Sequence, residues 1–431
     1  MNPGFYRNRV LATRAPRIPL AGQLLEAREA RVVSLLKPRA MLAIASPLVL
    51  GRAIDTSILD AAGYPVWREE RRSGLVDVQS VRISFSARLP EGGTERQSGM
   101  LHLPVPESAR ARALTWVVFL RGSEHLKNEV PSRGGGSEKS LMEATAALGY
   151  AVWAPDYAGM GDSDGVQEYC VPESMAASAL DGLAAARSFV AGNSSYYTET
   201  GRLVILGYSQ GGLATMATLE AAAKGSILTP GLRITAGYPL GAPLDLLLGV
   251  PFILEGTPVI VRPDYNILLV LGWARAYPGM IKVKDILLPG IIDEVVPLFD
   301  GTRDGDELCR CIAKAAGKKH DAVVAEDLYQ PAYLSAIELE PGTVPYFSLQ
   351  NAARLDRWSA PAGYPLMLAA SPEDELVPFH NSQNAFDWMS QHNPATEVSL
   401  TRLRSGSHRR AAVEGLLYAL IDMDSRERKV A

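Results

Sequence analysis

The chain has 431 residues, of which 47% are hydrophobic and 21% are charged, enough for one large domain or two ordinary ones with a substantial core. Its formal net charge of −4 is nearly neutral for this length and gives no argument for binding nucleic acid or a strongly acidic partner. No run of about 18 apolar residues is present, so no transmembrane helix is expected.

The first 60 residues are predicted to be an N-terminal extension. Basic residues outnumber acidic ones in residues 1–40, and the apolar segment 40–50 precedes Gly51-Arg52-Ala53. This arrangement fits a leader peptide of a secreted or periplasmic protein. It fits equally a basic arm followed by a helix packed on the domain of a cytoplasmic protein, so localisation stays open. Pro47 and the late position of the apolar segment weaken the first interpretation.

The globular domain is predicted to begin near residue 76 with a strand hairpin. Residues 78–87 alternate polar and apolar side chains, as a half-buried strand does, and 100–105 is the expected partner strand. Short apolar runs, typical of strands buried on both faces, then alternate with segments of helical spacing. The predicted strands are 114–120, 150–155, 203–206 and 234–238, and the predicted helices are 138–148, 172–190 and 212–224. This alternation predicts the α/β class, with a mostly parallel sheet covered by helices on both faces.

The alternation stops between residues 245 and 345. This part contains apolar segments punctuated by proline, followed by charged pieces predicted to be helical. The apolar segments are 250–254, 267–277 and 286–299, and the charged ones are 306–319 and 321–329. The α/β pattern then resumes with strand 365–370, helix 381–391, strand 397–403 and helix 409–421. The predicted parts are the extension (1–60), the first core part (61–244), the insertion (245–345) and the second core part (346–431).

The strongest catalytic motif is Gly207-Tyr208-Ser209-Gln210-Gly211, which lies between the predicted strand 203–206 and the predicted helix 212–224. Such a sharp turn strains the serine backbone and brings strand and helix so close that only glycine fits two residues on either side. We therefore expect the Ser209 hydroxyl to be held above the sheet as a nucleophile. The alternative is an ordinary glycine-rich turn.

A serine nucleophile needs an imidazole to take its proton, and the imidazole needs a carboxylate to orient it. His408 is our choice because it follows the last predicted strand, at the carboxyl edge where open α/β sheets place their sites. His392 precedes that strand, His380 lies close to the expected acid, and His320 lies in a Lys-rich polar stretch.

The acid should follow the preceding strand, 365–370, because the expected chain order is serine, acid, histidine. Asp374 is our choice, and its neighbours Glu373 and Glu375 are close enough to be confused with it. Asp245 follows the strand after the serine turn and is the alternative; otherwise it would cap the first helix of the insertion.

The oxyanion of an acyl-transfer intermediate needs two preorganised N–H donors. The backbone of Gln210, directly after the nucleophile, is one candidate. Ser123, with Gly122 as a hinge, is the other, because it lies in the loop after strand 114–120. Arg121 could be an ordinary surface charge.

The three cysteines, Cys170, Cys309 and Cys311, exclude a scaffold rich in disulfides. They are predicted to be free, or to form one bridge from Cys170 to Cys309 or Cys311. The pair Cys309-Arg310-Cys311 lacks a second Cys or His pair at ligand spacing, so no metal site is predicted.

Three further segments carry a family resemblance. Residues 154–163 follow the strand before the serine turn, Asp374-Glu375-Leu376-Val377-Pro378 is the acid loop, and Gly406-Ser407-His408 is the histidine loop. On these motifs the chain resembles the α/β-hydrolase superfamily, and within it the serine esterase and secretory-lipase branch. The resemblance covers residues 75–420 outside the insertion. Relatives usually have His-Gly where this chain has Arg121-Gly122, which puts the second oxyanion donor in question.

The resemblance implies an α/β-hydrolase fold in which the insertion is a helical cap over Ser209. A cap with an apolar inner face would form a pocket for acyl chains. The implied activity is hydrolysis of a small-molecule ester or lipid through Ser209, His408 and Asp374, without a cofactor. Acyl transfer or amide hydrolysis by the same residues, and a binding protein built on a hydrolase scaffold, are the alternatives. Chain-length preference and oligomeric state stay open.

Overall fold

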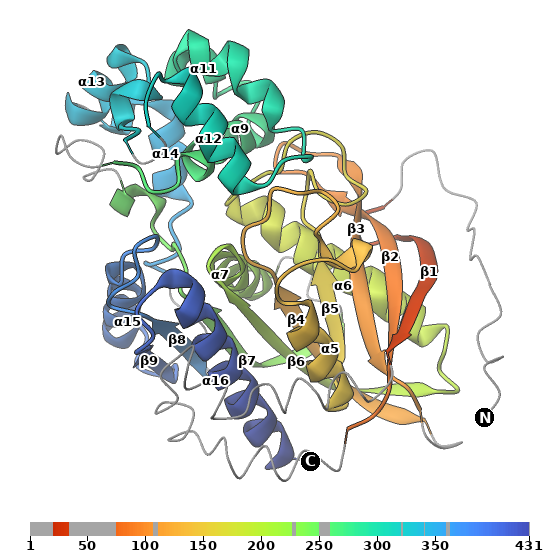
Figure 1. Cartoon of the computed structure of the whole chain (residues 1–431). Helices are drawn as coiled ribbons and strands as arrows, with labels where there is room; N and C mark the ends of the chain where they lie inside the picture. The colour runs from red at the N-terminus through yellow and green to blue at the C-terminus, as the bar shows by residue number, and fades with distance from the viewer. Residues whose placement is uncertain are drawn as a thin grey trace.

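The computed structural model describes residues 20–33, 75–106, 111–225, 230–249, 259–319, 322–339, 341–358 and 363–430. Within these residues, nine strands form one sheet in the order β1-β2-β3-β5-β4-β6-β7-β8-β9 (Figure 1). The pairings among β4 to β9 are parallel, and those that join β1, β2, β3 and β5 are antiparallel. The predicted α/β class with a mostly parallel sheet is therefore confirmed.

Every predicted strand is present in the sheet. The strands are β1 (Leu24–Val33), β2 (Val78–Arg88), β3 (Thr94–Pro104), β4 (Arg112–Leu120), β5 (Ala151–Pro155), β6 (Tyr197–Tyr208), β7 (Arg233–Leu240), β8 (Leu366–Ala370) and β9 (Val398–Arg402). β6 begins well before the apolar run that predicted it, because Tyr197 already pairs with Arg112 of β4 and the three residues after Tyr197 are exposed. The apolar run marks only the buried half of that strand.

Part of the expected N-terminal extension belongs to the sheet. β1 pairs antiparallel with β2 along its whole length, from Leu24 opposite Phe85 to Val33 opposite Val78, and forms one edge of the sheet. The side chain of Leu24 packs against the core. The apolar segment 40–50 lies outside the described residues, so the boundary at residue 60 stays a prediction.

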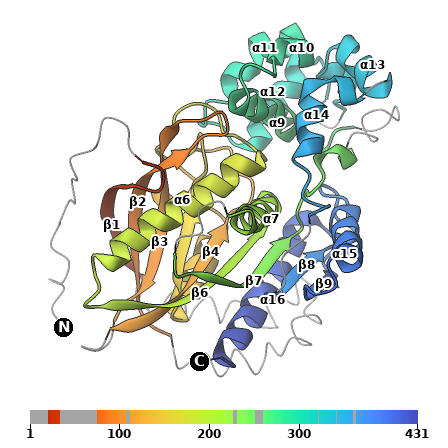
Figure 2. The ribbon, with the colours of Figure 1, turned by 180° about the vertical axis from the view of Figure 1, so that it is seen from behind.

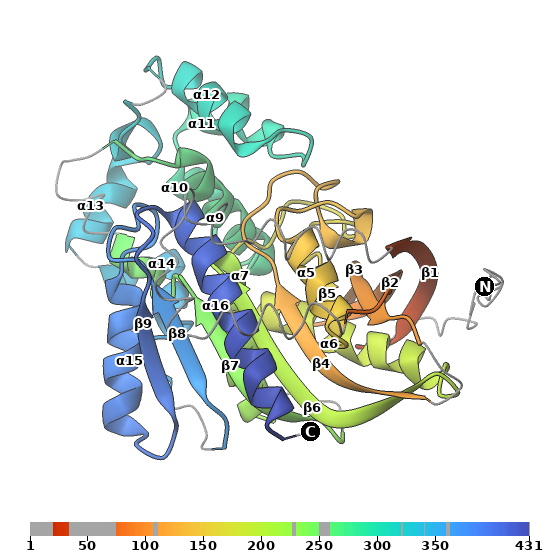
Figure 3. The same cartoon turned by 60° about the horizontal axis from the view of Figure 1, so that its bottom comes forward.

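Helices cover both faces of the sheet, as predicted (Figures 1 and 2). One face carries α6 (Pro172–Ala191), α7 (Gln210–Ala223) and α15 (His380–His392), and the other carries α5 (Lys139–Ala147) and α16 (His408–Arg428). Along β4, Trp116 and Val118 pack into the first layer, and Val117 and Phe119 pack into the second. Figure 3 shows α16 lying across β6 and β7 with its first turn toward the insertion.

The insertion is helical and lies beyond the carboxyl ends of the parallel strands (Figure 1). Its helices are α9 (Pro263–Ala276), α10 (Val283–Ile286), α11 (Pro289–Glu294), α12 (Gly305–Ala315), α13 (Pro331–Leu339) and α14 (Pro345–Ala352). A short 3-10 turn, η2 (Leu246–Gly249), precedes them, and three others lie between them: η3 (Val296–Leu298), η4 (Ala325–Asp327) and η5 (Pro341–Thr343). We call this insertion the cap. In the part of the chain described here, no helix is both long and apolar enough to span a membrane.

The prediction of a helix over residues 321–329 was wrong. Of the described residues there, only Ala325–Asp327 are helical, in a single 3-10 turn. The preceding Val323 is buried, and its carbonyl accepts a hydrogen bond from the Ile260 N–H at 2.7 Å. This link to a distant segment holds residue 323 in place outside a helix.

Candidate active site

Ser209 lies at the tip of the turn between β6 and α7, with a backbone φ of 59° and ψ of −122°. The two flanking glycines are required by close packing against β4. A Cβ atom on Gly207 would lie 2.4 Å from the carbonyl oxygen of Leu120, and one on Gly211 would lie 2.0 Å from the same oxygen. The turn therefore has the strain and the crowding that its sequence motif predicts.

The structure brings Ser209, His408 and Asp374 into one hydrogen-bonded chain. His408 Nε2 lies 2.8 Å from Ser209 Oγ, and His408 Nδ1 lies 2.6 Å from Asp374 Oδ2. His408 is the first residue of α16, and Asp374 follows β8, so three separate strand ends supply the three side chains. The carboxylate of Asp374 is fully buried, and the imidazole is nearly so.

Hydrogen bonds from neighbouring groups fix the orientation of the Asp374 carboxylate. Its Oδ1 atom accepts hydrogen bonds from the N–H groups of Leu376 and Val377, at 2.9 and 2.8 Å. The Tyr208 hydroxyl donates to Oδ2 at 3.5 Å, and the Tyr208 ring lies 5.0 Å from the His408 ring. Burial, and then the nearby Asp374 charge, raise the pKa of Tyr208, so its hydroxyl keeps its proton. Sequence reasoning missed this role, because Tyr208 is a variable position of the motif.

The two acidic neighbours of Asp374 face the histidine loop but not the imidazole. Glu375 Oε2 accepts a hydrogen bond from the backbone N–H of His408 at 2.9 Å. The Glu373 carboxylate packs against Gly406, where an added Cβ would lie 2.4 Å from it. Both residues support the loop that carries His408, and Asp374 contacts the ring.

The alternative acid, Asp245, has a different partner. It forms an ion pair with Arg354 at 2.8 Å and accepts a hydrogen bond from the Leu247 N–H at 2.9 Å, which caps η2. The other histidines after Ser209 are also engaged elsewhere or undescribed: His392 stacks on Trp388 at the end of α15, and His320 lies outside the described residues. His380 is the first residue of α15.

The loop after β4 is held by a buried arginine. Arg121 is only 2% exposed, so the interpretation as a surface charge was wrong. It donates to the carbonyls of Gly122 at 2.8 Å and Asp156 at 2.7 Å, and its guanidinium lies 4.7 Å from the centre of the Tyr157 ring. The arginine that replaces the relatives' histidine therefore ties this loop to the loop after β5.

The loops that carry the two predicted oxyanion residues begin at the ends of two neighbouring strands, β4 and β6. Leu120, at the end of β4, pairs with Gly207 of β6, so the loop with Ser123 runs beside the turn with Gln210. The Ser123 hydroxyl lies 2.6 Å from the hydroxyl of Tyr169. The N–H of Gly122 donates to Glu138 Oε1 at 2.9 Å. We call residues 121–125 the oxyanion loop, after the role predicted for Ser123.

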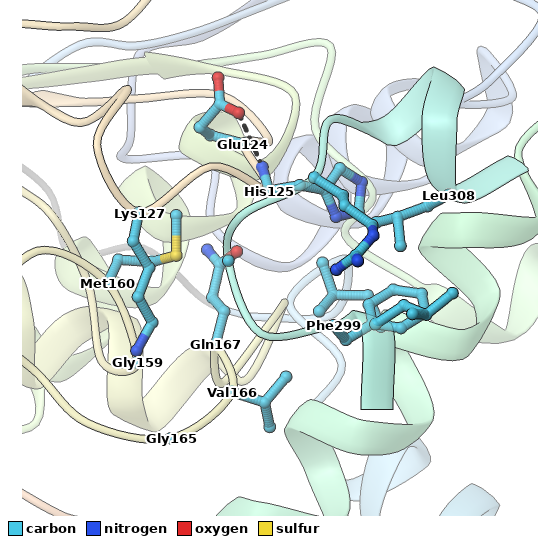
Figure 4. A pocket seen from close by; sticks show the side chains of 14 residues that line it. Glu124, His125, Lys127, Gly159, Met160, Gly165, Val166, Gln167, Phe299 and Leu308 are labelled. Carbon is cyan, nitrogen blue, oxygen red and sulfur yellow. Dashed lines mark hydrogen bonds between the residues drawn. The ribbon is translucent and has the colours of Figure 1, made fainter. Parts of the chain in front are cut away.

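A cavity lies between the oxyanion loop, the loop after β5 and the cap (Figure 4). Its volume is about 20 Å³, roughly the space that one water molecule needs. Its apolar lining is Met160, Val166, Leu268, Leu298, Phe299 and Leu308, and its polar lining includes Glu124, His125, Lys127, Gln167 and Arg303. The cap therefore supplies much of the apolar wall, and the core loops supply most of the polar wall.

All three cysteines are described, and all are free thiols, so the alternative of a bridge from Cys170 is wrong. The Cys309 thiol donates to Asp264 Oδ1 at 3.1 Å. Burial, and then the Asp264 charge, raise the pKa of Cys309 to about 12, which keeps it protonated and unreactive. No group of three or more potential metal ligands occurs among the described residues.

The comparisons with known proteins agree with this architecture. Residues 134–260 match the family model of secretory lipases. No curated protein matches the sequence of the chain. Among solved structures, the rice cell wall degrading esterase LipA from Xanthomonas oryzae is 18% identical, with 95% of this chain and 98% of that chain covered and a TM-score of 0.72.

Two other solved structures have a similar fold. A protein from Legionella pneumophila described as a hydrolase is 20% identical, with 95% and 99% of the two chains covered and a TM-score of 0.74. Candida antarctica lipase A in its closed state is 14% identical, with 94% and 83% covered and a TM-score of 0.61. These likenesses show the α/β-hydrolase fold, and the family match over residues 134–260 agrees with the resemblance to its secretory-lipase branch.

Proposed function

We propose that the protein hydrolyses carboxylic esters, with Ser209 as nucleophile, His408 as general base and acid, and Asp374 as the residue that orients His408. The observation that carries this proposal is the continuous hydrogen-bond chain from Ser209 Oγ through both nitrogens of His408 to Asp374 Oδ2. The secretory-lipase match and the esterases and lipases of similar fold support ester hydrolysis as the class of reaction.

In the acylation step, Ser209 Oγ attacks the ester carbonyl carbon while His408 Nε2 takes the serine proton. The positive charge that develops on the imidazole is stabilised by Asp374 Oδ2, which accepts from Nδ1. The oxyanion that forms on the substrate would be bound by the backbone N–H groups of Gln210 and Ser123. We assign the backbone N–H of Ser123 to this role because its hydroxyl is engaged by Tyr169.

Collapse of this intermediate breaks the ester C–O bond, and His408 gives its proton to the leaving alcohol. A water molecule then attacks the acyl enzyme, losing its proton to His408. As the acyl C–O bond breaks, His408 returns this proton to Ser209 Oγ and the carboxylic acid is released. Residues of the chain supply every catalytic group in this scheme. The match to the secretory-lipase family favours lipid or other acyl esters as substrates.

The test is hydrolysis of p-nitrophenyl esters from acetate to palmitate by the wild type and by Ser209→Ala, His408→Ala and the control His392→Ala. We expect the first two variants to lose about 10⁶-fold in kcat, as in other serine hydrolases, and the control to keep its rate. A fluorophosphonate should label the wild type and spare Ser209→Ala. Ester hydrolysis that survives in Ser209→Ala would refute the proposed nucleophile.

A further inference from the structure

Strained backbone in the described part of the chain gathers around the active site. The non-glycine residues with a left-handed φ there are Tyr157, Cys170 and Ser209, at 73°, 52° and 59°. Such conformations cost about 1–3 kcal/mol each and persist where the surrounding structure enforces them, commonly at functional sites. The strain at Ser209 belongs to the nucleophile turn. The other two positions lie in the loop after β5 and call for a separate explanation.

Both strained positions in that loop place a tyrosine hydroxyl on the oxyanion loop. The Tyr157 hydroxyl donates to the carbonyl of Arg121 at 3.2 Å. The Tyr169 hydroxyl, next to the strained Cys170, lies 2.6 Å from Ser123 Oγ. Burial raises the pKa of Tyr169 well above its ordinary value, so its hydroxyl keeps its proton and either hydroxyl of the pair can donate to the other. The loop after β5 thus holds the oxyanion loop at two points.

The first helix of the cap holds the same assembly from the other side. Tyr265 of α9 stacks on Tyr169, with ring centres 5.8 Å apart and planes 20° apart. It also stacks on His125 of the oxyanion loop, at 5.6 Å and 9°. Asp264, the preceding residue of α9, lies 2.7 Å from His125 Nε2. The cap therefore contacts both His125 and the tyrosine that holds Ser123.

We propose that the cap helix α9 positions the second oxyanion donor, with Tyr169 and Tyr265 as positioning residues that act through Ser123. This inference rests on the proposed function, because it assigns the Ser123 N–H to the oxyanion. An oxyanion donor contributes about 10²–10³-fold to kcat only if it is held within a few tenths of an ångström of its proper place. The cap then contributes to the chemistry even for esters with a short acyl chain, such as acetates.

The experiment uses p-nitrophenyl acetate and the full-length protein. Tyr169→Phe removes one hydroxyl and keeps the ring, so it should fold. Tyr265→Leu removes the stacking. The matched control is Tyr329→Phe, which deletes the hydroxyl of another buried tyrosine, one that accepts a hydrogen bond from Asn266 within the cap at 3.0 Å. We expect kcat to fall about tenfold in Tyr169→Phe and in Tyr265→Leu, with KM within twofold of the wild type, and no change in the control.

A second measurement separates positioning from general loss of stability. Phenylboronic acid forms a tetrahedral adduct on an active serine, so its affinity should weaken by the same factor as kcat/KM. Ser123→Ala breaks the same hydrogen bond as Tyr169→Phe, so the double variant should be no slower than the slower single variant. Unchanged kcat in Tyr169→Phe, or additive losses in the double variant, would overturn the proposal. Absence of wild-type hydrolysis would instead refute the proposed function.

Discussion

Asp374 and Asp245 both follow parallel strands at the carboxyl edge of the sheet, and their local sequences do not distinguish them. Their hydrogen bonds do. Asp374 uses one oxygen to accept two backbone N–H groups and presents the other to His408. Asp245 instead forms an ion pair with Arg354, where the cap joins the core. The difference predicts opposite consequences for the same substitution at the two positions.

We expect Asp374→Asn to lower kcat for p-nitrophenyl acetate by about 10⁴-fold with little change in fold. An amide in this place can hold the imidazole but favours the wrong tautomer and cannot stabilise the imidazolium. Asp245→Asn should keep kcat near that of the wild type and lower the melting temperature slightly, because Arg354 loses one of its two carboxylate partners, Asp245 and Asp356. If Asp245→Asn loses the greater activity, the assignment of the acid is wrong.

Arg121 illustrates how a polar residue can be structural at an active site. Its guanidinium joins two carbonyls of different loops and lies over the Tyr157 ring. A lysine cannot span both carbonyls with a planar fork. We therefore expect Arg121→Lys to lower the free energy of unfolding by about 1–3 kcal/mol, the cost of a buried acceptor left unpaired, as measured by urea denaturation. A variant as stable as the wild type would contradict this role.

The close approach of β4 to the turn between β6 and α7 predicts a severe effect of one methyl group. The Cβ of Gly211→Ala would lie 2.0 Å from the Leu120 carbonyl oxygen, which is backbone and cannot rotate away. We expect a loss of about 3 kcal/mol in unfolding free energy, typical of overpacking, together with lost activity. The control is Gly290→Ala in α11, where the structure has open space and alanine favours the helix. Equal stability of the two variants would contradict the packing argument.

The α/β elements could be predicted because strands buried on both faces produce uninterrupted apolar runs in the sequence. Helices are recognised by the helical spacing of their apolar residues. β1 could not, because it is an edge strand with several charged residues and pairs only through β2. The first half of β6 was missed for a similar reason, since its exposed side chains carry no apolar pattern. A strand can be recognised in the sequence when its burial produces an apolar run, as in β4, or a regular alternation, as in β2.

Part of the candidate site could likewise be predicted from the sequence, and part could not. Ser209 is predicted by a local motif, and His408 by chain order and the strand end before it, whereas the same two criteria leave both Asp374 and Asp245 as candidates for the acid. The roles of His125, Tyr169 and Tyr265 depend on contacts between segments far apart in the chain: Ser123 and Tyr169 are 46 residues apart, and His125 and Asp264 are 139 apart. No single segment contains the information that brings such pairs together.

One buried carboxylate, that of Asp264, links the cap to the core. Asp264 of α9 contacts His125 of the core, together with Arg262 and Cys309 of the cap. Burial alone would raise its pKa, but the hydrogen bonds from Arg262 and His125 outweigh burial and hold the pKa of Asp264 below its ordinary value. Its charge therefore stabilises the folded protein wherever the carboxyl of the unfolded chain is ionised.

This depressed pKa fixes the sign of a pH dependence. The contribution of Asp264 is fully present above the ordinary carboxyl pKa of about 4 and is lost as pH falls toward the lower folded value. Asp264→Asn should therefore cost about 3 kcal/mol of unfolding free energy at pH 7, with a smaller difference from the wild type at pH 3. Urea denaturation at pH 7, 5 and 3 measures this. Asp306→Asn is the matched control, because Asp306 lies 4.0 Å from the same Arg262 but is largely exposed, and screening by solvent should leave its effect negligible. A difference for Asp264→Asn that stays constant from pH 7 to pH 3 would show that the charge of Asp264 does not hold the cap on the core.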